Sequence, residues 1–177
     1  RTPWMNAHTG LFIDQELGGA LAAQTLRSAG RIRVAAVVEP TPQFETRRTG
    51  FEREIGDDAP VINLPDGAYR SAYNLAAERG TELTRYDGLF VGSDISALGV
   101  MNGLLDRGIP VPEEIAIIGF DDIEWARYAR PALTTVHQPR REVAAAAAHH
   151  IIALVNDSDD DTISTVFQPR VISRESC

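Results

Sequence analysis

The sequence contains one cysteine, Cys177, at its last position. A disulfide within the chain is therefore excluded, and so is a metal site built from several cysteines. The 177 residues include no apolar run of the length that crosses a membrane, and no signal peptide is recognised, so no membrane partner is expected. The scarcity of cysteine is typical of a reducing compartment, and we predict a cytoplasmic location.

Positive charge is also scarce. Lysine and arginine number 17 against 25 aspartates and glutamates, which gives a net charge of −8. Binding to nucleic-acid phosphates requires a basic face, so we do not expect this region to contact DNA by itself.

Several catalytic signatures are missing as well. The chain has no Gly-x-Gly-x-x-Gly motif after a strand, no phosphate-loop lysine and no Gly-x-Ser-x-Gly elbow. His149 and His150 are neighbours that point in different directions on a helix, so they cannot share a metal ion. We therefore predict a binding protein that is not an enzyme, with neither a metal nor another cofactor.

What the sequence does contain is a regular alternation of short apolar runs with helical patterns. Strands are expected at residues 11–14, 32–38, 61–64, 89–91, 115–120, 133–136 and 165–172. Helices are expected at residues 18–30, 43–55, 71–79, 94–108 and 139–155. This alternation predicts an α/β fold with a doubly wound parallel sheet and helices on both faces.

Polar residues follow two of the predicted strands. Ser93 and Asp94 come after residues 89–91, and Asp121 and Asp122 come after residues 115–120. Ligands of open parallel sheets bind beyond the carboxyl ends of the strands, so these residues predict one polar site. Asp121 could accept hydrogen bonds from two vicinal hydroxyls or could cap a turn, and its sequence position leaves both roles open. Asp122 is better explained by a structural role.

Arginine and aromatic residues offer further contacts. Arg47 lies on the predicted helix 43–55, where a guanidinium could grip a ligand, although most surface arginines are merely solvated. Phe44, Phe120 and Trp125 could stack on a sugar, but any one of them is more often part of the core.

A series of segments resembles the C-terminal half of transcription regulators of the lactose-repressor/galactose-repressor (LacI/GalR) family. They cover nearly the whole chain, and their order and spacing are specific to that family. The segments are Phe12–Asp14 with Gly18–Gly19, Thr46–Phe51, Gly92–Asp94 with Ala97–Gly99, Ile109–Pro112, Ile117–Asp122, Pro131–Gln138 and Ser173–Ser176.

The resemblance implies a periplasmic-binding-protein-like (type I) fold, represented mainly by its C-terminal subdomain. Residues 1–136 would form this subdomain of the effector-binding core. Residues 137–158 would be the crossing segment and a helix that normally packs on the N-terminal subdomain, and residues 159–177 would return as a strand. We expect the helix-turn-helix head and most of the first subdomain to precede residue 1.

The resemblance also implies a function. The region would bind a sugar or another small polar metabolite as effector, form a homodimer, and control operator DNA through the absent head, as a repressor does. The alternative is an exported sugar-binding protein for transport, and the upstream gene sequence would decide between them. A doubly wound enzyme is a third hypothesis that lacks the expected motifs.

Individual roles follow from the matched positions. The predicted ligand contacts are Arg47, Ser93, Asp94, Phe120, Asp121 and Gln138. The predicted dimer surface comprises Ile95, Leu98, Asn102, Trp125 and Tyr128. Two positions depart from the family pattern, because Gly67 stands where an aromatic residue often stacks on the ligand, and Ser93 stands where asparagine is common.

Overall fold

The computed structural model describes residues 10–56, 59–155 and 164–177. Its strands are β1 (Gly10–Ile13), β2 (Val34–Val38), β3 (Val61–Asn63), β4 (Gly88–Val91), β5 (Ala116–Asp121), β6 (Thr134–His137), β7 (Ser164–Phe167) and β8 (Arg170–Ile172). Its helices are α1 (Gln15–Ser28), α2 (Pro42–Ile55), α3 (Tyr69–Leu83), α4 (Asp94–Asp106), α5 (Glu124–Tyr128) and α6 (Arg140–Val155).

Six strands form the central sheet in the order β3-β2-β4-β5-β6-β8. The first five are parallel, which confirms the predicted doubly wound α/β fold. The sixth, β8, runs antiparallel to β6 at the sheet edge. The prediction of one continuous strand over residues 165–172 was wrong, because the chain leaves β7 at Phe167 and re-enters a different sheet at Arg170.

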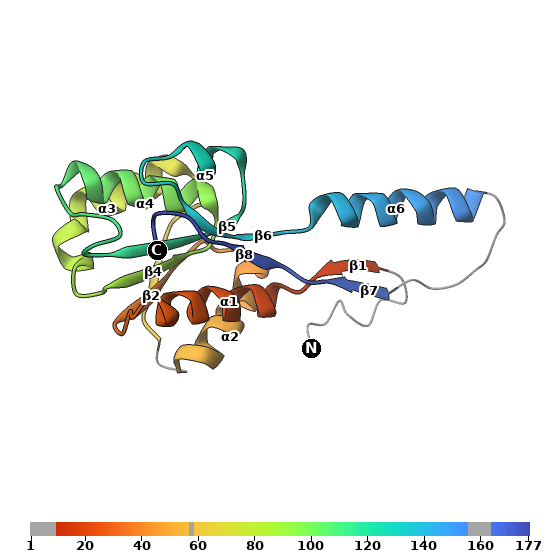
Figure 1. The fold of residues 1–177 in the computed structure, drawn as a ribbon, viewed down its shortest axis with the longest axis horizontal. Coiled ribbons are helices and arrows are strands. Elements are labelled where there is room, and N and C mark those ends of the chain that lie inside the picture. Colours follow the sequence, from red (N-terminus) through yellow and green to blue (C-terminus); the bar gives the residue numbers. More distant parts are fainter. Residues whose placement is uncertain (1–9, 57–58, 156–163) are drawn as a thin grey trace.

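Strand β7 pairs with β1 in a separate two-stranded parallel sheet (Figure 1). Its four residues are largely exposed, whereas all residues of β2 and β4 are buried. A parallel sheet requires cover on both faces, and this difference shows that the core belongs to the six-stranded sheet alone.

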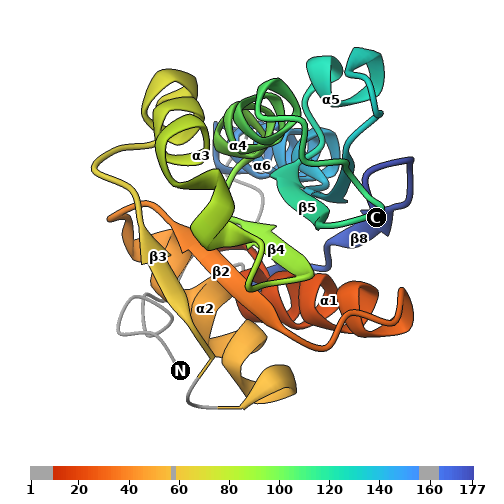
Figure 2. The same ribbon diagram turned by 90° about the vertical axis from the view of Figure 1, so that its left-hand side faces the viewer.

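Helices cover both faces of that sheet, with α1 and α2 on one side and α3 and α4 on the other (Figure 2). Successive side chains of β4 point to opposite faces of the sheet. Phe90 packs on the side of α1 and α2, whereas Leu89 and Val91 pack on the side of α3 and α4. The rings of Phe44 and Phe51 on α2 stack against Phe90 at centroid distances of 6.0 and 5.4 Å.

Side-chain caps fix where the helices begin. Of the two residues that the sequence offered as a cap, Ser93 and Asp94, it is Ser93 that caps α4 by accepting from the N–H of Ser96. Thr41 caps α2 immediately before Pro42. Helix α1 begins at Gln15 and not at Gly18 as expected, because the Asp14 carboxylate accepts from the N–H of Leu17 at 2.8 Å.

Helix α6 is unlike the others, because none of its residues is buried and it extends away from the sheet (Figure 1). Its packing on a first subdomain stays a prediction. The short helix α5 has no counterpart among the expected elements. Among the described helices, none has both the length and the hydropathy needed to span a membrane.

Candidate functional site

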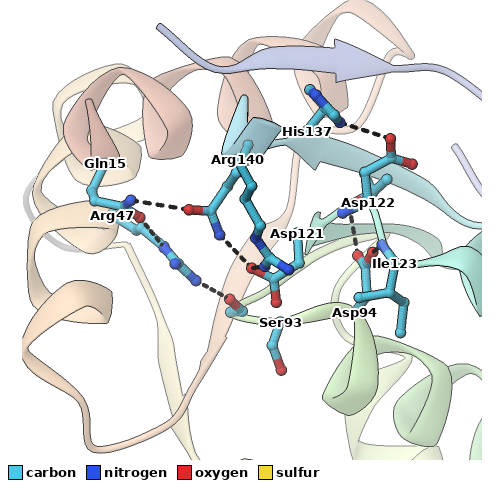
Figure 3. Close-up of polar contacts among 12 residues, drawn as sticks. Gln15, Arg47, Ser93, Asp94, Asp121, Asp122, Ile123, His137 and Arg140 are labelled. Carbon is cyan, nitrogen blue, oxygen red and sulfur yellow. Dashed lines mark hydrogen bonds and ion pairs between the residues drawn. The ribbon is translucent and has the colours of Figure 1, made fainter. Parts of the chain in front are cut away.

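The candidate site lies at the carboxyl ends of the parallel strands, where predicted and unpredicted polar residues gather. Glu39 follows β2, Ser93 follows β4, Asp121 ends β5 and Gln138 follows β6. These strands are adjacent and parallel, so their ends meet at one edge of the sheet. Figure 3 shows Arg47, Asp121 and Arg140 converging there.

Close packing of α1 on α2 places Arg47 at this edge. A Cβ atom on Gly19 would lie 1.8 Å from the backbone oxygen of Arg47, and one on Gly50 would lie 1.8 Å from that of Glu16. Only glycine permits such an approach of two helix backbones. The two glycines therefore hold α2 where the Arg47 side chain reaches over the sheet end.

The Arg47 side chain is 9% exposed and has several partners. Its Nε donates to Gln15 Oε1 at 2.7 Å, and its Nη1 donates to the Gly92 carbonyl at 2.5 Å. Its guanidinium carbon lies 3.7 Å from the ring centroid of Phe120, a cation–π arrangement. Burial lowers the pKa of Arg47, while Asp121 and Glu39 act in the opposite direction.

Asp121 supplies a carboxylate beside this cation. Its φ of 118° is a backbone conformation that favours glycine, so the surrounding contacts hold it in place. Its Oδ1 accepts from Gln138 Nε2 at 2.5 Å and from Arg140 Nη2 at 2.8 Å, and Oδ2 receives no hydrogen bond from the described residues. Burial raises the pKa of Asp121, and Arg47 and Arg140 partly offset that effect.

Amide side chains join the two charged groups into one network. Gln15 Nε2 donates to Gln138 Oε1 at 3.4 Å, while Gln15 Oε1 accepts from Arg47. Gln138 in turn donates to Asp121. The network therefore runs from Arg47 through both glutamines to Asp121.

Three members of this site were not predicted from the sequence: Gln15, Glu39 and Arg140. Glu39 Oε1 accepts from the hydroxyls of Ser93 at 2.5 Å and Ser96 at 2.8 Å. Glu39 directly follows a buried apolar strand, as Asp121 ends another, and that shared pattern could have identified it. Gln15 and Arg140 begin helices and have no comparable sequence signal.

Asp94 and Phe120 are placed differently from what a direct ligand contact requires. The Asp94 carboxylate is fully buried, with Oδ1 accepting from the Thr135 hydroxyl at 2.6 Å and Oδ2 from the N–H of Ile123 at 2.9 Å. Phe120 is also fully buried beneath Arg47. This geometry favours supporting roles for both residues, so their predicted ligand contact would require the site to rearrange.

Burial controls the protonation of Asp94. Desolvation raises its pKa to about 7, although the hydrogen bonds from Thr135 and Ile123 act in the opposite direction. Figure 3 shows this carboxylate directed towards Ile123, apart from the Arg47–Asp121 network.

Asp122 has a structural role, as expected. Its carboxylate contacts His137 Nδ1 at 2.8 Å and Arg174 Nη2 at 2.6 Å. Burial would raise the pKa of Asp122, but the hydrogen bonds from Arg174 and His137 outweigh it and the pKa is lowered.

The predicted dimer residues lie on α4 and α5. Ile95, Trp125 and Tyr128 are 40%, 68% and 56% exposed, whereas Leu98 is nearly buried at 9%. Asn102 donates to the hydroxyl of Tyr69 at 2.8 Å. Three large apolar side chains are thus available to a partner, and their use in a dimer stays a prediction.

Two other features bear on alternative sites. A cavity of 580 Å³ lies around Arg33, Ile55 and Tyr86, and the described residues that line it include arginines but no carboxylate. Within residues 10–56, 59–155 and 164–177, no cluster of histidine, cysteine and acidic residues could hold a metal ion.

Comparison with known proteins places this geometry in a family. Residues 23–177 match the model of the periplasmic binding protein-like domain. The ribose operon repressor of Escherichia coli K12 is 32% identical over 134 residues, which are 72% of this chain and 41% of that protein. The repressor PurR of Aliivibrio fischeri MJ11 is 31% identical over 95% of this chain and 53% of its own length. The chain thus spans about half the length of the curated relatives it matches, or less.

Solved structures agree. A LacI-family regulator from Enterococcus faecalis with bound ribose has a TM-score of 0.86 and 25% identity, over 95% of this chain and 62% of that one. The regulator CelR in complex with cellobiose has a TM-score of 0.84 and 25% identity, over 96% of this chain and 54% of that one. The chain therefore belongs to the periplasmic binding protein-like domain family, and the solved structures that it resembles include LacI-family regulators.

Proposed function

We propose that this chain is the effector-binding and dimerisation region of a DNA-binding repressor, and that a sugar or a related small polar metabolite binds at the Arg47–Asp121 network. The effector would control operator binding allosterically. The observation that carries the proposal is the placement, at the same end of the sheet, of a buried guanidinium and a carboxylate with one oxygen that accepts no hydrogen bond from the described residues.

The chemistry of this pair suits vicinal hydroxyls. The guanidinium of Arg47 donates to hydroxyl oxygens, while Asp121 accepts from hydroxyl protons. The two glutamines orient both groups before a ligand arrives, which reduces the ordering cost of binding. The ribose and cellobiose complexes of related regulators support the same ligand class.

The connection to α6 suggests how binding is transmitted. Gln138 and Arg140 both hold Asp121. Gln138 lies in the segment that joins β6 to α6, and Arg140 is the first residue of α6. A sugar hydroxyl that displaces either side chain from Asp121 would release that segment and change the preferred orientation of α6. Such a change shifts the population between two conformations, as allosteric control requires.

A thermal-shift experiment on the intact protein tests the proposal. D-Ribose, cellobiose, D-ribose 5-phosphate and adenine are compared on the wild type, Arg47→Ala and Asp121→Ala. Ligand at about 100 times its Kd stabilises the folded state by about 2.7 kcal/mol. We expect stabilisation by a sugar in the wild type and its loss in both variants.

Arg48→Ala is the matched control, because Arg48 lies next to Arg47 on α2 but pairs with Glu45 and Glu52 at the surface. It should keep the full ligand response. Stabilisation that survives both Arg47→Ala and Asp121→Ala would refute the proposed site, and stabilisation by adenine alone would refute the sugar class.

A further inference from the structure

The carboxylate of Glu39 occupies the space next to Gly67. A Cβ atom added to Gly67 would lie 2.5 Å from Glu39 Oε2 and 2.9 Å from its Cδ. No side chain at residue 67 is compatible with this position of Glu39. The missing aromatic residue at Gly67 and the carboxylate of Glu39 are thus two parts of one arrangement.

One oxygen of Glu39 is held and the other is available. Oε1 accepts from the hydroxyls of Ser93, the cap of α4, and Ser96, in the first turn of α4, at 2.5 and 2.8 Å. Oε2 receives no hydrogen bond from the part of the chain that the structure describes. The side chain is half-buried, so its orientation is fixed while one acceptor stays free.

Glu39 follows β2 at the same edge of the sheet as Asp121. The carboxylates of Asp121 and Glu39 both act to raise the pKa of Arg47, against the effect of its burial. The strand ends around Arg47 therefore carry two carboxylates, each with one oxygen that accepts no hydrogen bond from the described residues.

We propose that Glu39 is a specificity-determining ligand contact, which accepts a hydrogen bond from a hydroxyl of a neutral sugar and excludes sugar phosphates and sugar acids. This inference rests on the proposed function. A carboxylate oxygen accepts only from donors, and an anionic group brought to Oε2 would meet a like charge in a partly desolvated site. Discrimination then comes from repulsion as well as from the hydrogen bond.

Isothermal titration calorimetry on the intact protein tests this role with D-ribose, cellobiose and D-ribose 5-phosphate. Glu39→Gln keeps an oxygen for Ser93 and Ser96 but replaces the free acceptor by a donor. We expect the neutral sugar that binds the wild type to bind this variant about 10- to 100-fold more weakly. D-Ribose 5-phosphate should bind the variant more tightly than it binds the wild type.

Glu45→Gln is the control, because Glu45 is an exposed residue of α2 that pairs with Arg48. Glu45→Gln should bind each of the three probes with the affinity of the wild type. Gly67→Ala provides a second variant that leaves Glu39 chemically intact but displaces its carboxylate. Gly67→Ala alone should weaken sugar binding. Added to Glu39→Gln, it should have no further effect on sugar affinity.

The possible failures are distinguishable. If Glu39→Gln and Gly67→Ala both bind the sugar within twofold of the wild type while Asp121→Ala does not bind it, the role of Glu39 is refuted and the proposed function stands. If D-ribose 5-phosphate binds the wild type more tightly than either neutral sugar, the exclusion of anions is refuted. If none of the three probes binds the wild type, the inference fails together with the sugar site on which it rests.

Discussion

The buried carboxylate of Asp94 should make the stability of this protein depend on pH in a direction opposite to that of most aspartates. Its pKa is raised from 3.8 in the unfolded chain to about 7 in the folded protein. The folded state therefore holds this proton more tightly, and the free energy of unfolding falls as the pH rises from about 4 to about 7. The full shift corresponds to at most about 4 kcal/mol.

The perturbation that isolates this effect is Asp94→Asn. The amide can accept from the N–H of Ile123 through its oxygen and donate to the Thr135 hydroxyl through its nitrogen, so both contacts of the carboxylate have a replacement. The variant carries no ionisable group at this position. The free energy of unfolding of Asp94→Asn, relative to that of the wild type, should therefore increase by about 2.5 kcal/mol between about pH 5 and about pH 8.

Urea denaturation followed by far-UV circular dichroism measures this difference at both pH values. Titrating groups that do not interact with Asp94 are common to both proteins and cancel in the comparison. Thr135→Val is the opposing control, because it removes a hydrogen bond that favours the ionised form of Asp94. Its stability should fall more steeply with pH than that of the wild type. If the difference in the free energy of unfolding between the wild type and Asp94→Asn is the same at both pH values, the reasoning is refuted.

Three further predictions follow from the packing and the site. Arg47→Lys should bind sugar as poorly as Arg47→Ala in calorimetry, because an ammonium cannot reproduce the planar guanidinium above Phe120; affinity equal to the wild type would contradict this. Gly50→Ala should lower the free energy of unfolding by about 1–3 kcal/mol in urea denaturation, since its Cβ would lie 1.8 Å from the Glu16 oxygen. An unchanged denaturation midpoint would show that α1 and α2 can move apart with little loss of stability. Trp125→Ser, which removes a 68% exposed ring, should weaken dimerisation in analytical ultracentrifugation without changing sugar affinity, and an unchanged dimer would exclude α5 from the interface.

The sequence predicted most of the core because the relevant signals are local. Leu89, Phe90 and Val91 form an apolar run that only a strand covered on both faces can bury, and the structure buries all three. Ser93 caps the following helix because its own side chain satisfies a nearby N–H. When strands alternate with helices, few topologies are possible, and this alternation predicted that neighbouring strands run parallel.

The candidate site was predicted only in part, because neighbouring residues at a strand end can face opposite ways. Asp94 and Asp121 have similar sequence contexts, yet the first is buried against Thr135 while the second contacts Arg140 in the Arg47–Asp121 network. The difference depends on which partners the tertiary structure places beside each carboxylate. Glu39 directly follows a buried strand in the sequence, but only the tertiary structure places its carboxylate in the space beside Gly67.

The sequence by itself determined most of the helices and strands, the parallel direction of the central strands, the edge at which polar groups gather and the resemblance to a family. Tertiary structure alone decided the direction of β8, the separate pairing of β1 with β7, and the joining of Gln15 to Gln138 across 123 positions. Helix and strand formation depend on residues a few positions apart, which the sequence displays directly. Hydrogen bonds between distant side chains depend on how closely the elements that carry them approach. The close approach of α1 and α2 at Gly19 and Gly50, for example, brings Gln15 to Arg47.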